Sequence, residues 1–403
     1  MDIEDTIILH YSIPESRGGE SRYKESVNWG ALIRMALFHD VFPSIYKNFE
    51  NEGWKGVPHN RVKQFHSLWK EHIARHIILV DELKSILGLF EKEGIKTVPL
   101  KGYLMGAMCY PDDILRAFKD IDIWVSPQDM PRAKMLLEGE GYVPVPYKSF
   151  ETEAENKYNT PFYRYLPCNK RICVELHWKL AYFRDYSGVP ERKCWKNCQR
   201  TLIYGNEFFT LLPEDLFIYL IVKIHATRYI YLKKFVDLYQ FLACYESTLD
   251  WEYIRGELKE MGMINNFLFA LSTMRMLFKE SFKGKSQINS VKCTKRAKGS
   301  VRVYMFEKLI NPVTILHGRY DSDLRHAFSL LLNDNFRDSI ASFMRVLFPS
   351  RGGIAHRYKI LPGSHKVYMY YLFNPIFIIY RLIRGFTVRS WGEINVKAIF
   401  LHD

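Results

Sequence analysis

The strongest constraint on the fold is a strand-like segment at residues 120–125, DIDIWV, in which aspartate alternates with apolar residues. Side chains of a β-strand alternate between its two faces, so Asp120 and Asp122 share one face. The residues between and after them, Ile121, Ile123 and Val125, share the other face and suit a core. Because a slip of one residue would expose them, the register of this strand is fixed. Two carboxylates are thereby held side by side at the start of a buried strand.

The neighbouring segments predict an α/β core around this strand. Residues 97–100 indicate another strand, residues 103–110 a short helix, and residues 126–142 a longer helix. Residues 162–167 and 171–180 flank a short CNK segment and indicate a β-hairpin. Because strands and helices alternate, we expect an α/β (α+β) fold class with a small mixed β-sheet and flanking helical N- and C-terminal regions.

Helical patterns precede and follow this core. Apolar residues at steps of three and four indicate the first helical region, and a Pro-Glu-Asp triplet suits the start of the later one. We expect a weakly ordered arm over 1–26, a helical region over 27–94, the α/β core over 95–212, a helical region closing a cleft over 213–281, and a basic helical region over 282–403.

Charge and apolar content limit the partners and the location of the chain. Its 57 Lys and Arg residues exceed its 44 Asp and Glu residues, and the net charge of +13 favours anionic partners, although solubility alone would also account for it. The seven cysteines do not have the spacing of a disulfide framework, and no signal peptide is recognisable. Both observations predict a cytoplasmic protein. No apolar run reaches transmembrane length. Residues 367–386 come nearest; we expect a buried helix pair there, with a helix lying on a membrane surface as the alternative.

A third carboxylate is available in residues 171–177. The alternation there turns Ile172, Val174 and Leu176 inward and places Glu175 and His177 on the opposite face. If this strand pairs beside residues 121–125, Glu175 joins the aspartates; an exposed sheet edge is the alternative. Three such carboxylates hold two metal ions about 4 Å apart in enzymes of phosphoryl and nucleotidyl transfer. We therefore expect Asp120, Asp122 and Glu175 to be catalytic and to bind Mg²⁺ or Mn²⁺.

Cationic residues near the aspartates are candidates for binding phosphate. Lys101 and Gly102 lie between a predicted strand and a predicted helix, where backbone N–H groups can approach an anion. Arg116 and Lys119 come just before the aspartates. We expect these four residues to bind the nucleotide. The chain has no P-loop, dinucleotide or hydrolase signature.

Three further residues are candidates for supporting the site. His177 shares a face with Glu175 and either orients it, binds metal or packs on Trp178. His225 lies in an apolar helical segment, where a core histidine is the ordinary alternative. Asp237 either holds Arg228, Lys233 or Lys234 at the cleft or forms an exposed ion pair of little energetic weight.

These segments resemble a known family. Residues 100–125, with their LKGYLMGAMCYPDDILRAFKDIDIWV run, look like the core motif of the polymerase-beta-like nucleotidyltransferase superfamily. Residues 174–180 and 213–242 are similar to later blocks of its "uncharacterised nucleotidyltransferase" family branch. The resemblance implies a two-metal core with Asp120 and Asp122 as metal ligands and Glu175 as the third carboxylate. The chain departs from the superfamily's Gly-Ser motif, because Lys101-Gly102-Tyr103 stands in its place and has no serine.

The predicted function is that of a metal-dependent nucleotidyltransferase. It would move a nucleoside monophosphate from an NTP substrate, with ATP as the first candidate, to an acceptor hydroxyl or amine and release pyrophosphate. The acceptor, whether a small molecule, a protein or RNA, is not specified by the sequence. One alternative is a catalytically inactive nucleotide-sensing or scaffold protein on the same fold. Another is a nucleic-acid-binding protein that uses its basic C-terminal half.

Overall fold

The computed structural model describes most of the first three quarters of the chain and parts of the remainder. The described residues are 2–15, 27–144, 159–167, 170–180, 191–279, 315–317, 332, 334–358, 360–361 and 363–387. Contacts divide the chain into two units, Met1–His317 and Gly318–Asp403. The basic segment at 282–302 lies outside the described residues.

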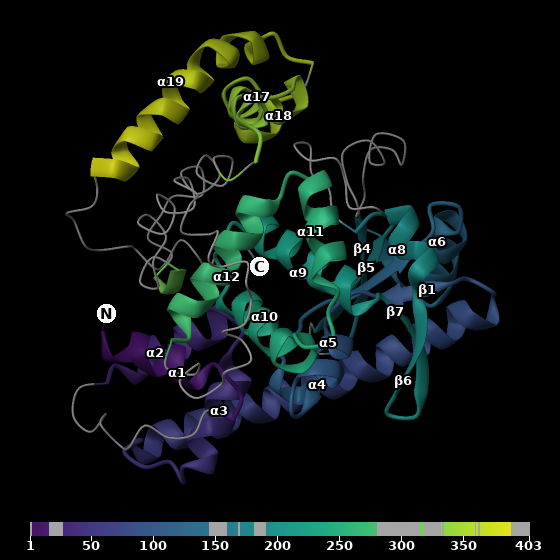
Figure 1. Ribbon diagram of the computed structural model, residues 1–403, viewed down its shortest axis with the longest axis vertical. Coiled ribbons are helices and arrows are strands. Elements are labelled where there is room, and N and C mark those ends of the chain that lie inside the picture. Colours follow the sequence, from purple (N-terminus) through teal and green to yellow (C-terminus); the bar gives the residue numbers. More distant parts are fainter. Residues whose placement is uncertain are drawn as a thin grey trace. The chain divides into compact units, whose positions relative to one another are not determined.

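The first unit is built on a five-stranded mixed sheet, as the sequence predicts (Figure 1). The order of its strands is β1 (Thr97–Pro99), β2 (Ile121–Val125), β5 (Arg171–His177), β4 (Asn159–Tyr165) and β3 (Val143–Pro144). All five residues of β2 are buried, which suits its place inside the sheet. The hairpin predicted from residues 162–180 is the antiparallel pair of β4 and β5.

The pairing of β2 with β5 determines which side chains meet. These two strands are parallel, and Asp122 lies opposite Glu175 in their register. The β1–β2 pair is antiparallel and places Pro99 opposite Ile123, so the chain that leaves β1 runs back past the start of β2. The residue after β1, Leu100, donates its backbone N–H to the Asp122 carbonyl at 3.1 Å. Lys101 therefore emerges beside the aspartates.

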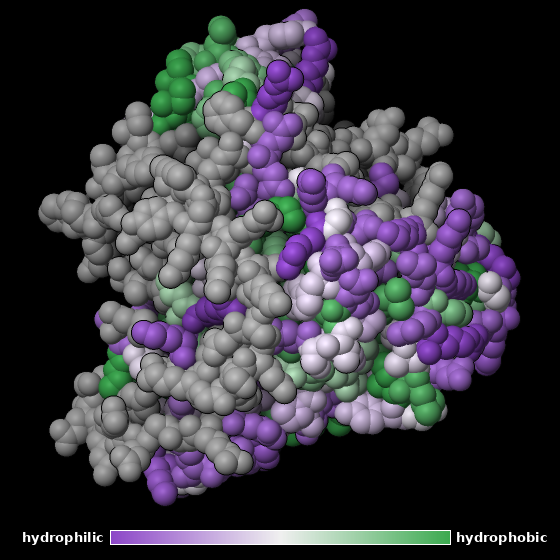
Figure 2. Space-filling view, in the orientation of Figure 1, coloured by the Kyte–Doolittle hydropathy of each residue, from purple (hydrophilic) through white to green (hydrophobic). Residues whose placement is uncertain are grey.

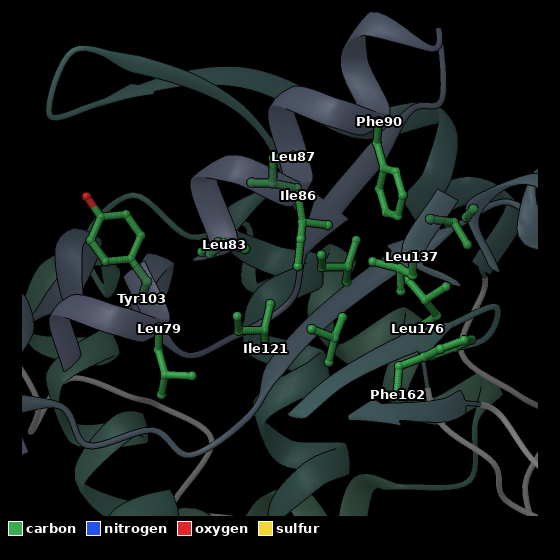
Figure 3. Close-up of a cluster of buried hydrophobic side chains, with 14 of the residues drawn as sticks. Leu79, Leu83, Ile86, Leu87, Phe90, Tyr103, Ile121, Leu137, Phe162 and Leu176 are labelled. Atoms are coloured by element: carbon green, nitrogen blue, oxygen red, sulfur yellow. The ribbon is translucent and has the colours of Figure 1, made fainter. Parts of the chain in front are cut away.

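One face of the sheet is covered by the long helix α4 (His59–Lys92) and by α6 (Met130–Gly139). The apolar stripe of α4 packs onto side chains of β2, β4 and β5, as Figure 3 shows. The helix contributes Leu79, Leu83, Ile86, Leu87 and Phe90, and the strands contribute Ile121, Phe162 and Leu176. Each such side chain that is fully buried stabilises the fold by about 1.5–3 kcal/mol, so this contact fixes the orientation of the sheet.

The N-terminal region is helical, with α2 (Trp29–Phe38) and α3 (Phe42–Asn51) preceding α4. The structure differs from the expected weakly ordered arm, because residues Ile3–Tyr11 form helix α1. Its Ile7 and Ile8 are fully buried, so the apolar residues of this short segment are sufficient to dock it. Residues 16–26 of the expected arm lie outside the described part of the chain.

A short segment between β1 and β2 contains α5 (Tyr103–Cys109) and the 3-10 helix η1 (Asp113–Leu115). After β5 come α8 (Glu191–Asn197) and a hairpin of β6 (Gln199–Ile203) with β7 (Asn206–Thr210). This hairpin was not among the elements predicted from the sequence. Its signal is the two-residue Tyr-Gly turn, whose positive φ angles of 46° and 78° are those of a tight hairpin turn.

The predicted helical region after residue 213 consists of four helices. They are α9 (Pro213–Ala226), α10 (Leu232–Tyr245), α11 (Trp251–Glu260) and α12 (Ile264–Leu277). Helix α9 begins with proline at its first turn and carries two acidic residues there, which suits the positive end of the helix dipole. Helix α10 contacts both α9 and α5, so it reaches the segment that joins β1 to β2.

The second unit contains α17 (Phe336–Leu347), α18 (Arg351–Tyr358) and α19 (Lys366–Thr387). Val346, Leu347 and Ile378 form its small apolar cluster. Pro375 lies inside α19, where it removes one backbone hydrogen bond. Within the described residues, no helix combines the length and the apolar character that crossing a bilayer requires.

Candidate active site

Three potential metal ligands meet where β2 and β5 run side by side. Asp122 is only 3% exposed, and its Oδ1 lies 2.9 Å from Nε2 of His177. The same Nε2 lies 3.4 Å from Oε2 of Glu175. One ligand atom from each of these residues lies within 4.8 Å of the other two. The structure thus brings Asp122 and Glu175 together and adds His177 as a direct neighbour.

Asp120 stands apart from this group. It precedes β2, and its side chain is 38% exposed. Its carboxylate lies 4.0 Å from Nζ of Lys101, and it does not belong to the compact ligand group of Asp122, Glu175 and His177. The parallel register explains the difference, because it sets Asp122 and not Asp120 opposite Glu175.

Lys101 neutralises the aspartates from the end of β1. Its Nζ lies 3.0 Å from Oδ2 of Asp122. Burial alone would raise the pKa of Asp122, but the Lys101 ammonium and the hydrogen bond from His177 outweigh it and hold that pKa well below its ordinary value. Burial opposes the charge of Lys101 as well, and the two aspartates overcome it and raise the pKa of Lys101 well above its ordinary value. Both groups are therefore ionised at neutral pH.

Gly102 has the backbone conformation that its position in the turn requires. Its φ is 68° and its ψ is −123°, a combination that side-chain-bearing residues rarely adopt. A Cβ atom at this position would lie 3.4 Å from the ring of Phe118. Glycine therefore lets the chain turn sharply between Lys101 and α5.

Arg116 lies beneath this turn and not among the carboxylates. Its Nε and Nη2 each donate to Asp237 of α10 at 2.8 Å, and its Nη1 donates to the Gly102 carbonyl at 3.1 Å. Tyr110 adds a hydrogen bond to Asp237 at 2.7 Å. The guanidinium predicted to contact phosphate is therefore buried and bonded to protein groups in this structure. Asp237 likewise pairs with Arg116, a partner that the sequence analysis did not consider.

Two other predicted site residues, Lys119 and His225, contact partners outside the group of Asp122, Glu175 and His177. Lys119 is exposed and pairs with Asp40 at 2.7 Å, and Lys233 pairs with the same carboxylate at 2.8 Å. His225 is buried in α9, with Nδ1 3.3 Å from the hydroxyl of Tyr229. No described contact joins Lys119 or His225 to Asp122.

Lys223, a buried lysine of α9, was not predicted from the sequence as a site residue. Burial and then the positive charge of Lys101 lower the pKa of Lys223 to about 8, against the opposing influence of Asp122, Glu175 and Asp120. The carboxylates of Asp122, Glu175 and Asp120 therefore all belong to the electrostatic surroundings of Lys223. Its only sequence signal is a lysine in the otherwise apolar run FIYLIVKI.

Lys234 of α10 is a further lysine of this region, and its positive charge is disfavoured there. Burial, followed by the charges of Lys101 and Lys233, lowers the pKa of Lys234 well below its ordinary value. Lys101 thus pairs directly with Asp122, and its charge lowers the pKa of both Lys223 and Lys234. Positive charges next to carboxylates suit a ligand that carries both phosphate and a divalent cation.

The donor set fits a divalent metal ion. Two carboxylates and one imidazole lie on adjacent strands with their ligand atoms within 4.8 Å of one another. Carboxylate oxygens suit Mg²⁺ and Mn²⁺, and an imidazole nitrogen favours Mn²⁺ over Mg²⁺. The low pKa of Asp122 keeps that carboxylate in the form that binds metal.

Comparison with known proteins agrees with the predicted family. A family model described as uncharacterised nucleotidyltransferase matches residues 25–279, more than half of the chain. No curated protein matches the chain. Among solved structures, an antigenic nucleotidyltransferase-like protein from Paracoccidioides brasiliensis is 12% identical, with a TM-score of 0.31 over 53% of this chain and 92% of that one.

Proposed function

This chain belongs to the uncharacterised nucleotidyltransferase family, and on that premise we propose that it transfers a nucleoside monophosphate from an NTP to an acceptor hydroxyl or amine. Pyrophosphate is the second product, and ATP is the first NTP to test. The observation that carries this proposal is the register of the parallel strands, which sets Asp122 opposite Glu175 with His177 in contact with both.

In this proposal the side chains around Asp122 bind a divalent cation and accept a proton from the acceptor. Asp122, Glu175 and His177 hold a divalent cation, with Asp120 as a further carboxylate at the edge. Such an ion supplies positive charge to the phosphates and makes a bound hydroxyl more acidic. Glu175 is half-buried and accepts a hydrogen bond from Asn159 at 2.5 Å. It is the carboxylate best placed to take a proton from an acceptor, because Asp122 is buried and paired with Lys101.

The lysines bind the triphosphate in this proposal. Lys101 extends from the turn at Gly102, and Lys223 and Lys234 come from α9 and α10. The buried Arg116 contributes indirectly, because it holds the Gly102 carbonyl and so fixes the turn that follows Lys101. Lys119, which is exposed, would reach phosphate only by leaving Asp40.

The test is transfer of label from α-labelled ATP with Mg²⁺ or Mn²⁺ and a cell extract as the source of acceptor. We expect the wild type to release pyrophosphate and to label an acceptor, and Asp122→Asn to do neither. Asp81→Asn is the matched control, because Asp81 is an exposed residue of α4. Equal turnover by Asp122→Asn and the wild type would refute the proposed site.

A second function has one specific observation in its favour. The ammonium of Lys101 already neutralises Asp122 at 3.0 Å, so the carboxylate has a counter-ion of its own. A nucleotide-sensing protein without turnover would use this arrangement to bind NTP only. For such a sensor, ATP should raise the melting temperature while no pyrophosphate forms with any acceptor. For the enzyme, ATP should raise the melting temperature and pyrophosphate should form.

A further inference from the structure

Helix α19 presents an apolar face to solvent. Leu372 is 75% exposed and Ile376 is 66% exposed, and the neighbouring large apolar residues of this face are also exposed. The exposed set is Tyr368, Met369, Leu372, Phe373, Ile376, Phe377, Ile379 and Tyr380. Figure 2 shows hydrophobic side chains gathered on the surface of this C-terminal unit. At a helical spacing of 100° per residue, these positions cover one half of the helix.

The rotation of α19 about its axis is fixed by a buried polar residue on the opposite side. Asn374 is fully buried and donates to the carbonyls of Val346 at 3.2 Å and Leu347 at 2.6 Å, both at the end of α17. It accepts hydrogen bonds from Arg357 at 2.7 Å and from Tyr358 at 3.0 Å, both in α18. Turning the helix to bury its apolar face would leave these groups unpaired, at about 1–3 kcal/mol each. The exposed face is therefore held outward.

The segment that carries this face has an extreme charge bias. From Ser339 to Gly392 the chain has eight Lys and Arg residues and no Asp or Glu. These eight charges are a large share of the net charge of +13. Two of them, Lys366 and Arg351, are exposed next to the start of the apolar face, and Arg351 lies over the ring of Tyr368 at 4.8 Å.

We propose that this α19 face binds the surface of an anionic lipid bilayer, with the helix lying in the interface. Its apolar residues would enter the boundary of the acyl chains while the surrounding basic residues contact lipid headgroups. Tyrosines at both ends of the face, Tyr368 and Tyr380, suit the level of the headgroups.

The charges favour this partner over two others. A second copy of the chain would bring the same excess of positive charge to the contact, so like charges would oppose pairing through this face. A nucleic acid would complement the charge, but it would leave an apolar centre around Leu372 and Ile376 without matching contacts. An anionic bilayer complements both the charge and the apolar centre.

Co-sedimentation of the full chain with lipid vesicles tests the proposal. We expect binding to phosphatidylcholine vesicles that contain phosphatidylglycerol, weaker binding to phosphatidylcholine alone, and loss of binding as salt increases. The double variant Leu372→Glu/Ile376→Glu is expected to reduce partitioning by at least about tenfold. The matched control is Met135→Glu/Leu202→Glu, because those side chains are 70% and 69% exposed in the first unit and the change in net charge is the same.

A second variant separates charge from apolar contact. Arg351→Gln/Lys366→Gln is expected to weaken binding to anionic vesicles by about fivefold per charge removed while changing binding to neutral vesicles little. It also serves as the test if circular dichroism shows that Leu372→Glu/Ile376→Glu does not fold. The proposal is overturned if the wild type does not bind anionic vesicles, or if the control variant loses binding equally. A wild-type dimer that Leu372→Glu/Ile376→Glu dissociates, without vesicle binding, would also overturn it and assign the face to self-association.

Discussion

Replacing Asp237 with asparagine should destabilise the first unit far more than its single change of charge would suggest. The Arg116–Asp237 pair is almost completely buried, and its two direct hydrogen bonds are each 2.8 Å long. Asparagine keeps the shape but presents an NH₂ group to one of the Arg116 donors. It also leaves the guanidinium charge buried without a counter-ion.

Removing one partner of a buried ion pair costs about 3–5 kcal/mol. That loss is a large part of the total stability of about 5–15 kcal/mol that is typical of folded domains. Burial alone would raise the pKa of Asp237, but the charge and hydrogen bonds of Arg116 reverse this and lower it. The stabilisation is therefore complete above the ordinary carboxyl pKa and is lost as the pH falls through the lower folded value.

Urea unfolding of wild type and Asp237→Asn measures this cost directly. Hydrogen–deuterium exchange should also increase in peptides that cover residues 102–116, because Arg116 holds the Gly102 carbonyl. The control is Arg132→Gln, since the Arg132–Glu93 pair is largely exposed and should contribute less than about 1 kcal/mol. A loss below about 1 kcal/mol for Asp237→Asn, or exchange unchanged in that segment, would show that the pair does not hold the turn.

Three further predictions concern the core and the site. Gly106→Ala should lower stability by about 1–3 kcal/mol, because its Cβ would lie 2.9 Å from a backbone carbonyl oxygen. The control, Gly88→Ala in α4, places its Cβ where no atom lies within 4 Å and should raise stability by up to about 1 kcal/mol. Thermal melting curves of the two variants measure both effects. Lys223→Met should weaken ATP binding below about pH 8, with a difference from wild type that shrinks at higher pH as the wild-type lysine loses its charge, and calorimetry over a pH series measures it. His177→Gln should weaken Mn²⁺ binding by about 10–100-fold, whereas His225→Gln should not. The electron paramagnetic resonance signal of free Mn²⁺ measures binding to both variants. Equal effects of the two substitutions would contradict the proposed metal site.

The strands of the core were predictable because their signals are local. The alternation in 120–125 sets the faces of β2, and the same alternation in 171–177 sets those of β5. Placing Glu175 near Asp122 required only that the two strands be neighbours, which the structure confirms. The parallel register is what excludes Asp120 from the compact group, and no local pattern encodes a register between strands so distant in sequence.

The contacts that the sequence does not reveal are long-range. Arg116 and Asp237 are 121 residues apart, so nothing near Arg116 indicates that it is bonded inside the protein and not exposed to phosphate. Lys223 likewise lies far along the chain from Asp122 and Asp120, two of the carboxylates that influence its pKa. The docking of α1 likewise depends on partners that lie elsewhere in the chain.

The parallel arrangement of β2 and β5 has a consequence for synthesis of the protein. A parallel neighbour cannot be reached by a tight turn, and here the crossover includes α6, β3 and β4 before β5 is made. A nascent chain that stops before Arg171 carries both aspartates but lacks the strand that supplies their partners. Asp122 therefore meets Glu175 and His177 only after β5 has been made and has paired with β2.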